Sequence, residues 1–179
     1  MTKLDRFGRA FSSELVKFNA CREAVKWASE QKSAAAAWRD CQRGDWMLWL
    51  LGRLSGQSGS AARKKLVLCA CACARLSLKH VPAGEDRPRL AIEKAEAYAR
   101  GEAVTIDEVR SAAYAAAAAY SAAAYAAACA ADAACAAAVY AAGAAAYDAR
   151  TKSLAECATI VREHYPKPPR LVAKKGGAK

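Results

Sequence analysis

The residues best suited to hold a ligand lie in one short charged phrase. Asp86, Arg87 and Arg89 stand at the expected start of a helix that ends near Arg100. Two arginines at a helix N-terminus can hold a phosphate or a carboxylate, because guanidinium groups and free backbone N–H groups both donate hydrogen bonds to anions. The same arginines can pair with Glu93 and neighbouring carboxylates, and such ion pairs outnumber anion sites in proteins. The sequence favours pairing and leaves anion binding as an alternative.

Tyrosines form a second group of candidate binding residues. Tyr98 lies on the helix that Asp86 starts, and Tyr114 and Tyr125 lie eleven residues apart in the alanine-rich segment that follows. Eleven residues is close to three helical turns, so these two rings would share a helix face. Such a face can line a groove, where each ring supplies stacking area and a hydroxyl group. The predicted binding residues are Asp86, Arg87, Arg89, Tyr98, Arg100, Tyr114 and Tyr125.

Three of the eight cysteines, Cys69, Cys71 and Cys73, alternate with alanines. On a helix Cys69 and Cys73 share a face while Cys71 points elsewhere, and His80 lies about 10 Å further along the axis. A zinc site needs four converging ligands, usually at loop spacings such as CxxC. The sequence therefore predicts buried, reduced cysteines that pack as small hydrophobic residues, and no metal site.

No catalytic centre is expected from the remaining reactive residues. The two histidines, His80 and His164, lie at expected helix ends and outside any recognisable catalytic motif. A nucleophilic Cys or Ser needs a base within reach, and the sequence has neither a Gly-rich nucleotide loop nor an HExxH pattern. We expect a protein that is not an enzyme and that uses no cofactor.

Charge and hydropathy bear on the compartment. No apolar stretch follows the N-terminal charges, so a signal peptide is not expected, the cysteines do not imply disulfides, and the expected location is the cytoplasm. The alanine-rich segment is long enough to cross a membrane, but alanine is only weakly apolar and Asp132 lies in its middle, so no membrane span is expected.

The net charge is +11, and residues 166–179 contain five basic residues and no acid. A basic balance of this size is compatible with an acidic partner.

The alanine-rich segment determines the expected fold. Between Ser111 and Ala149, 26 of 39 residues are alanine. Most of its larger side chains fall on one helical face, which favours a central helix packed closely against its neighbours. One helix of this length would measure about 60 Å, so a bend or break near Gly143 is expected. Two alternatives are an exposed alanine face that binds a flat surface, and a Tyr/Ser/Asp face that lines a groove.

Capping signals place the other helices. Starts are expected at Ser12–Ser13, Asn19, Ser33, Gly44–Asp45, Ala61, Asp86 and Thr105, the last forming a capping box with Glu108. The helix from Ala61 is expected to reach about His80, and the apolar stretch from Trp46 to Leu54 is expected in the core. No stretch alternates as a strand does. We expect an all-α, single-domain multi-helix bundle over residues 1–165, built around a long alanine-rich central helix or helix pair, and a basic, disordered tail at 166–179.

The phrase from Gly84 to Glu102 resembles the Imm-5-like immunity proteins, which are alanine-rich helical proteins of bacteria and phages. The family phrase has the form D-x-R-P-R-x-A-I-E-x-A-x-x-W-x-R-G-E. The matching residues here are Asp86-Arg87-Pro88-Arg89, Ala91-Ile92-Glu93, Ala95, Tyr98 in place of the usual Trp, and Arg100-Gly101-Glu102. The likeness extends over roughly Arg63 to Arg150. It implies a cytoplasmic protein that neutralises a toxin or another effector by binding it.

Three functions follow as expectations. The first is a non-enzymatic intracellular binding protein, an immunity-type inhibitor of a toxin or of a host or phage effector. The second is a binder of a small anionic ligand or nucleotide that uses Arg87, Arg89 and a Tyr-lined groove. The third is a nucleic-acid-associated protein that contacts phosphates through its basic tail, although no known nucleic-acid-binding motif is present.

Overall fold

Helices make up all the regular secondary structure in the part of the chain that the structure describes. The computed structural model describes residues 3–57, 59–76, 78–81, 83–116 and 151–171. The helices are α1 (Lys3–Lys17), α2 (Arg22–Ser29), α3 (Ala34–Asp40), α4 (Gly44–Leu54), α5 (Ala61–Arg75) and α6 (Arg87–Arg100), with a 3-10 turn, η1 (Leu78–His80). Residues 106–116 and 151–164 are also helical. The expected all-α class is confirmed.

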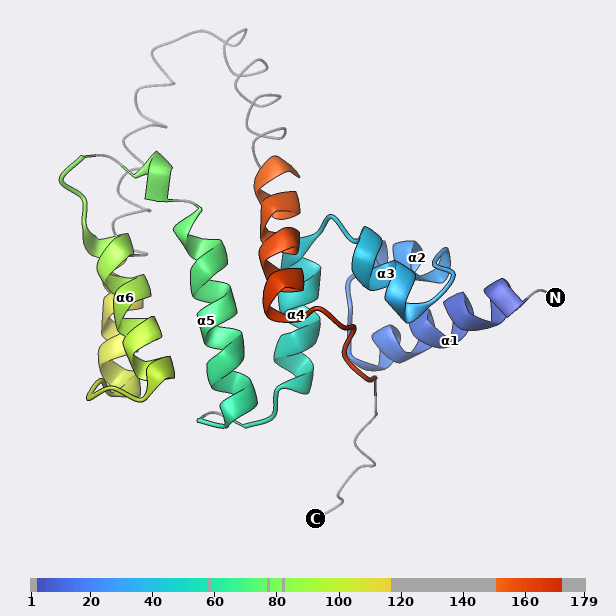
Figure 1. Ribbon diagram of the computed structural model, residues 1–179, viewed down its shortest axis with the longest axis horizontal. Coiled ribbons are helices and arrows are strands. Elements are labelled where there is room, and N and C mark those ends of the chain that lie inside the picture. Colours follow the sequence, from blue (N-terminus) through green and yellow to red (C-terminus); the bar gives the residue numbers. More distant parts are fainter. Residues whose placement is uncertain (1–2, 58, 77, 82, 117–150, 172–179) are drawn as a thin grey trace, which may run out of the picture.

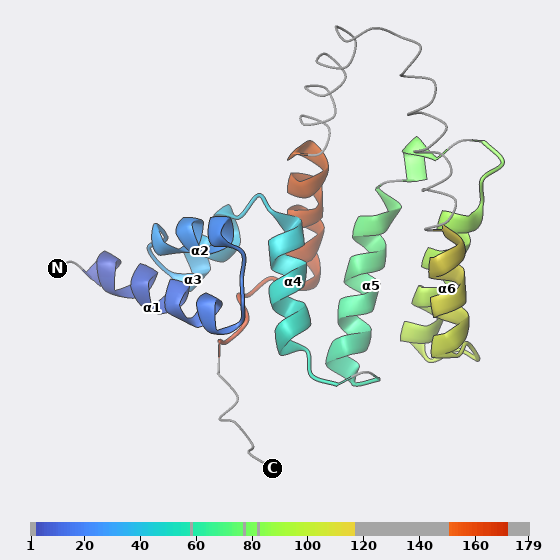
Figure 2. The ribbon, with the colours of Figure 1, turned by 180° about the vertical axis from the view of Figure 1, so that it is seen from behind.

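The helices stand in a row, as Figure 1 shows. α6 and α5 occupy one end, α4 and the helix 151–164 lie together in the middle, and α1, α2 and α3 form the other end. Figure 2 shows the same order from behind. A helix late in the chain therefore lies beside one from its first third, and the two enclose much of the core.

The main hydrophobic core joins α3, α4, α5 and the helix 151–164. Its buried members are Trp38, Cys41, Met47, Leu51, Leu66, Cys69, Cys73, Ala158 and Val161. Burial of Met47, Leu50 and Leu51 confirms that the apolar stretch of α4 belongs to the core. Burying an aliphatic side chain of this size stabilises the fold by about 1.5–3 kcal/mol.

Gly44 allows α4 to begin in direct contact with the helix 151–164. A Cβ atom added at Gly44 would lie 2.4 Å from Cβ of Cys157 and 2.6 Å from the backbone nitrogen of Ala158. Both distances are shorter than van der Waals contact, so glycine is required here by packing. Arg162, on the same late helix, donates a 2.8 Å hydrogen bond to the carbonyl of Cys41 at the end of α3. This bond satisfies one of the carbonyls that a helix end leaves free.

α5 is buried along two sides, which explains its run of small residues. Cys69 and Cys73 face the main core, whereas the Cys71 thiol donates to the carbonyl of Ile92 on α6, at 3.8 Å. All three thiols are buried and free, as expected. The expected extension of this helix to His80 is wrong. The helix ends at Arg75, where the backbone N–H of Leu76 bonds to the carbonyl of Cys73 at 3.1 Å and the ladder tightens from i+4 to i+3.

Two expected helix starts lie in the wrong place. α1 runs through Ser12–Ser13 instead of beginning there. Asn19 ends α1 rather than capping α2, because it adopts a left-handed φ of 61° that Asn tolerates better than most residues. α2 begins at Arg22, after Cys21.

The capping signals at Ser33 and Thr105 are confirmed. The Ser33 hydroxyl accepts a 3.0 Å hydrogen bond from the backbone N–H of Ala36. The backbone N–H of Glu108 donates to the Thr105 hydroxyl at 3.2 Å, and the Glu108 carboxylate accepts from the backbone N–H of Thr105 at 2.7 Å. These reciprocal bonds make a complete capping box at the start of the helix 106–116.

Most of the alanine-rich segment, including Tyr125, Asp132 and Gly143, lies outside the described residues. The packed central helix or helix pair therefore stays a prediction. The described part, residues 111–116, is largely exposed, and Tyr114 has 76% of its surface accessible.

The chain continues past the helix 151–164 into an extended segment. Residues 166–171 are described, and Leu171 packs against the small cluster of Leu15, Ala28 and Leu50. Residues 172–179 lie outside the described part. No helix among the described residues is long and apolar enough to cross a membrane.

Candidate binding site

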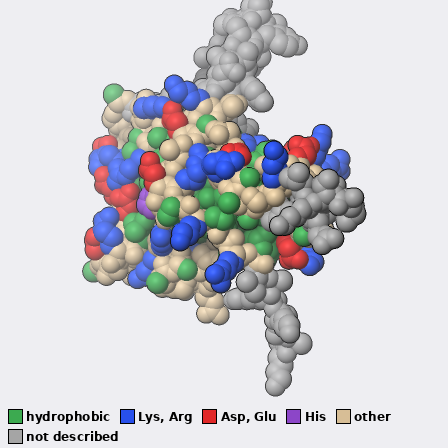
Figure 3. All heavy atoms as spheres, turned by 45° about the vertical axis from the view of Figure 1, so that its right-hand side comes forward, with side chains coloured by type: hydrophobic (Ala, Val, Ile, Leu, Met, Phe, Trp, Pro, Cys, Tyr) green, Lys and Arg blue, Asp and Glu red, His purple; other side chains and the backbone are tan. Residues whose placement is uncertain are grey.

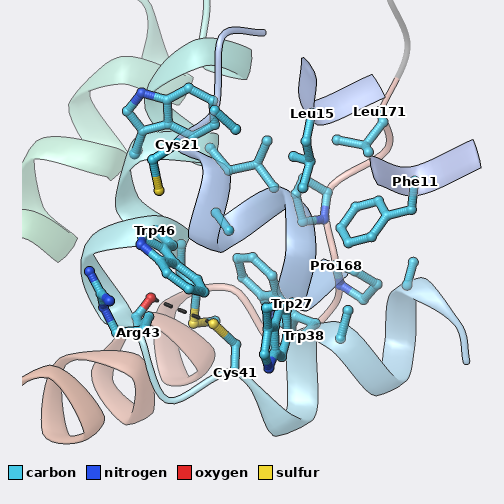
Figure 4. Close-up of a pocket in the computed structure, with 18 of the residues that line it drawn as sticks. Phe11, Leu15, Cys21, Trp27, Trp38, Cys41, Arg43, Trp46, Pro168 and Leu171 are labelled. Atoms are coloured by element: carbon cyan, nitrogen blue, oxygen red, sulfur yellow. Dashed lines mark hydrogen bonds between the residues drawn. The ribbon is translucent and has the colours of Figure 1, made fainter. Parts of the chain in front are cut away.

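A hollow of about 500 Å³ lies between α1, α2, α3, α4 and the extended segment at 168–171. We call it the tryptophan pocket, because all four tryptophans of the chain, Trp27, Trp38, Trp46 and Trp49, line it. Figure 4 shows Trp27, Trp38 and Trp46 on one side of the pocket, with Phe11, Leu15, Pro168 and Leu171 on the other. The pocket is large enough for several apolar side chains, or for one short segment of chain.

The indole rings are held by packing and by hydrogen bonds. The ring centroids of Trp27 and Trp46 lie 6.1 Å apart with their planes tilted by 57°, within the range of favourable aromatic pairs. The indole N–H of Trp38 donates to the carbonyl of Tyr165 at 2.7 Å. Trp49 is 36% exposed. The pocket therefore combines fixed aromatic walls with one exposed ring, that of Trp49.

Arg43 and Asp45 give the pocket a polar edge. Two hydrogen bonds, at 2.9 and 2.6 Å, join the Arg43 guanidinium to the Asp45 carboxylate, and the guanidinium carbon lies 4.3 Å from the centroid of the Trp46 ring. Burial favours the neutral form of Asp45, but the hydrogen bonds and positive charge of Arg43 together hold the pKa of this carboxyl below its usual value. The hydrogen bond to Asp45 also raises the pKa of Arg43. This edge orients the Trp46 ring and offers charges to a ligand.

Two cysteines line the same pocket without forming a catalytic pair. The Cys41 thiol is buried and donates to the carbonyl of Arg43 at 3.6 Å, and burial raises its pKa. Cys21 is exposed, at the pocket wall. Among the described residues no histidine lines the pocket, so within this part of the chain neither thiol has the neighbouring imidazole that would activate it as a nucleophile.

A second hollow, of about 610 Å³, lies against the same extended segment. The two hollows share part of their lining, namely Phe11, Ala34, Pro168, Pro169 and Leu171. The second hollow is also lined by Glu14, whose Oε1 atom pairs with the ammonium of Lys17 at 2.6 Å. Its Oε2 atom is buried and has no hydrogen-bond partner among the described residues. Unsatisfied buried acceptors are rare and costly, so this oxygen marks a place for a donor.

The arginines predicted to bind an anion are paired with carboxylates instead. Arg87 binds Glu85 through its guanidinium and through its backbone N–H, and these hydrogen bonds lower the pKa of Glu85 to about 2. Arg89 binds Asp86 at 3.0 Å and Glu93 at 2.9 Å. The pairing that the sequence favoured is confirmed, and neither hollow includes these arginines.

Asp86 holds the N-cap position of α6, but its side chain does not cap the helix. Its carboxylate turns to Arg89, and the carboxylate of Glu85 accepts the backbone N–H of Arg87 in its place. Pro88 lies in the first turn and Gly101 ends the helix with a left-handed φ of 86°, as expected.

The other predicted binding residues are not brought together. Arg100 pairs with Glu102 and Glu96, and Tyr98 has the ammonium of Lys64 at 5.9 Å from its ring centroid. Tyr114 points to solvent on the helix 106–116, far along the chain from the pocket. Among the described residues these tyrosines and arginines line neither hollow.

The buried thiols of α5 remain a packing feature. Burial raises the pKa of Cys71 to about 11. Partial burial also raises the pKa of Cys157, on the neighbouring helix 151–164, to about 12. Hydrogen bonding with Cys69 and burial together raise the pKa of Cys73. No group of three or more His, Cys, Asp or Glu residues in the described ranges could hold a metal ion.

Sequence reasoning missed the tryptophan pocket, although a signal was present. All four tryptophans fall between residues 27 and 49, and Trp is the residue type most enriched at binding hot spots. Comparison with known protein families, curated proteins and solved structures finds no match to this chain.

Proposed function

We propose that this chain is a non-enzymatic binding protein of the immunity type, and that it takes an apolar anchor of a protein partner into the tryptophan pocket. Such a protein inhibits a toxin or another effector by occluding the partner's surface with preformed helices. Two observations support this function. The phrase from Asp86 to Glu102 resembles the Imm-5-like immunity proteins, and four tryptophans line a preformed hydrophobic hollow. We propose that the protein binds its partner in the cytoplasm.

The composition and size of the pocket carry this proposal. A preformed apolar cavity of about 300–1,000 Å³ with a few polar groups at its edge is typical of a ligand site. Here the walls are aromatic and the polar groups are Arg43 and Asp45. Tryptophan and arginine are also the residue types that contribute most to protein–protein binding energy. A partner's Leu, Phe or Met side chain would bury apolar area against Trp27 and Trp46 without requiring a new hydrogen bond.

The surface around the pocket suits a folded partner better than a small anion. Figure 3 shows hydrophobic side chains exposed among Lys and Arg side chains on one face of the molecule. The arginines that a small anion would need, Arg87 and Arg89, already neutralise carboxylates. An anion would have to compete with these carboxylates for the guanidinium groups, as it would not at a site with unpaired arginines.

The test is a binding measurement with matched variants. The chain is co-expressed with the products of the genes that neighbour its own, and any complex is measured by calorimetry. Trp49→Ala removes an exposed pocket ring, and we expect it to weaken binding about tenfold or more, as truncation of a hot-spot residue does. Leu90→Ala is the control, because Leu90 is an exposed apolar residue on α6, 45% accessible and outside the pocket.

A second control separates the protein partner from a small anion. Arg87→Ala with Arg89→Ala should leave the affinity for the protein partner unchanged. If this double variant abolished binding while Trp49→Ala had no effect, the ligand would bind at the start of α6 and the proposal would be wrong.

A further inference from the structure

The extended segment Lys167–Leu171, which we call the strap, follows Tyr165, a residue that is held firmly in place. The carbonyl of Tyr165 accepts the indole N–H of Trp38 at 2.7 Å, and its backbone N–H donates to the carbonyl of Val161 at 2.8 Å. The ammonium of Lys65 lies 4.7 Å from the centroid of the Tyr165 ring. Tyr165 is therefore fixed by three contacts, and the strap follows it directly after Pro166.

The strap itself is held only by side-chain packing. Pro168, Pro169 and Leu171 are half-buried, whereas Lys167 and Arg170 point to solvent. Prolines have no N–H to donate, and within the described residues no hydrogen bond joins the strap to the rest of the chain. Segments with few buried contacts and no backbone hydrogen bonds open at low free-energy cost.

The strap fills its groove incompletely. Hollows of about 500 and 610 Å³ remain beside it. Glu14 lines the second hollow together with Pro168 and Pro169. Lys17 pairs with its Oε1 atom at 2.6 Å, whereas its buried Oε2 atom has no donor among the described residues. Two successive prolines cannot supply that donor, so the strap occupies the groove without satisfying it.

We propose that the groove beneath the strap binds an extended apolar segment of the protein partner, which displaces the strap and donates a backbone N–H to Glu14. This inference rests on the proposed function for the existence of a partner and adds the chemistry of the bound segment. The bound segment places a Leu-like side chain where Leu171 now packs against Leu15. It carries ordinary residues in place of Pro168 and Pro169, because a proline has no backbone N–H to donate to Glu14.

Competition between the strap and a free peptide gives a direct test. The probe is a synthetic peptide of residues 165–171 in which Pro168→Ala and Pro169→Ala restore two N–H groups. Its Kd is measured by tryptophan fluorescence against the full-length chain and against a full-length Leu171→Asp variant, in which the strap is released. A tethered competitor acts at about millimolar effective concentration, so we expect the variant to bind the peptide about tenfold more tightly or better. Leu90→Asp is the matched control on α6 and should leave the wild-type Kd unchanged.

Two further arms identify the contacts. Glu14→Ala, added to Leu171→Asp, should weaken binding of the peptide about threefold to tenfold, which is the effect of losing one hydrogen bond to a charged acceptor. A peptide that also carries Leu171→Asp should not bind. Equal Kd values for the wild type and Leu171→Asp, or no binding to Leu171→Asp at about millimolar peptide, would overturn the proposal.

A measurement on the unmodified chain covers the case in which Leu171→Asp fails to fold. Trypsin can cleave between Arg170 and Leu171 only when the strap leaves its groove. Saturating peptide should therefore accelerate this cleavage, as followed by mass spectrometry, and an unchanged rate would contradict displacement.

Light scattering tests whether a second copy of the chain occupies the groove. If it shows a dimer that the peptide converts to a monomer, the occupant is the strap of a second copy, and the proposal of a partner segment is wrong. None of these arms requires the natural partner, so their failure leaves the Trp49→Ala experiment free to test the proposed function separately.

Discussion

The indole N–H of Trp38 and the backbone carbonyl of Tyr165, 127 residues apart in sequence, are joined by a 2.7 Å hydrogen bond. This bond attaches α3, which carries one wall of the tryptophan pocket, to the end of the helix 151–164, where the strap begins. The pocket and the strap are therefore built on a common support.

We expect Trp38→Phe to lower the free energy of unfolding by about 1–3 kcal/mol, because it leaves the Tyr165 carbonyl without its donor and opens a small gap in the core. Urea unfolding followed by circular dichroism measures the change. Trp49→Phe, which alters an exposed ring on α4, is the control and should change stability by less than about 0.5 kcal/mol. Equal stabilities for wild type and Trp38→Phe would show that the bond contributes nothing.

Replacing either of two glycines of α4 with alanine should change the stability of the chain in opposite directions. Gly44→Ala places a Cβ 2.4 Å from Cys157 Cβ, and overpacking of this kind destabilises a protein by about 1–3 kcal/mol or more. Gly52→Ala meets no atom closer than 3.9 Å and replaces a glycine in the middle of a helix, so it should stabilise the chain by about 0.5–1 kcal/mol. Thermal unfolding of both variants tests the contact. A Gly44→Ala protein as stable as Gly52→Ala would place α4 and the helix 151–164 further apart than the structure has them.

The Arg43–Asp45 pair predicts a loss of stability in acid. The pKa of Asp45 is lower in the folded chain than its usual 3.8. A depressed pKa means that the folded state binds its proton less readily than the unfolded state, so the stabilisation is present above 3.8 and is lost as the pH falls through the folded pKa. Asp45→Asn should therefore be less stable than wild type at about pH 6 and approach it at about pH 3. A constant difference between the two proteins over this range would mean that Asp45 does not titrate with folding.

The exposure of the cysteines predicts their reactivity. Cys21 is exposed, whereas Cys41, Cys69, Cys71 and Cys73 are buried, and burial raises the pKa of Cys71 to about 11. Since the thiolate is the reactive species, an aromatic disulfide reagent should modify Cys21 in the native chain before the buried thiols. Cys21→Ala should remove one fast-reacting thiol, and Cys71→Ala should remove none. Loss of a fast phase in Cys71→Ala would contradict the burial of α5 against α6.

Local signals in the sequence were sufficient for the all-α class and for several helix boundaries. Helix caps contact residues only three or four positions away, so their hydrogen bonds and backbone angles follow from the local sequence alone. This holds for Ser33, for Thr105 with Glu108, and for Gly101. The pairing of Arg89 with Glu93 on one helical face could be predicted for the same reason.

The tryptophan pocket could not be predicted in this way, because its walls come from distant parts of the chain. Phe11, Trp38 and Pro168 meet only after the helix 151–164 returns to α4 and α3. Gly44 gave no local indication of its role, since its partner Cys157 lies more than a hundred residues away. The charged phrase at Asp86 allowed both pairing and anion binding, and the structure shows that Arg87 and Arg89 each have a carboxylate partner.

We propose that the tryptophan pocket receives an apolar anchor from a protein partner. The most direct measurement is the Kd of the complex with the product of a neighbouring gene, for the wild type, Trp49→Ala and the matched Leu90→Ala. The account predicts that Trp49→Ala raises the Kd by about tenfold or more while Leu90→Ala leaves it unchanged. Equal Kd values for Trp49→Ala and wild type would contradict it.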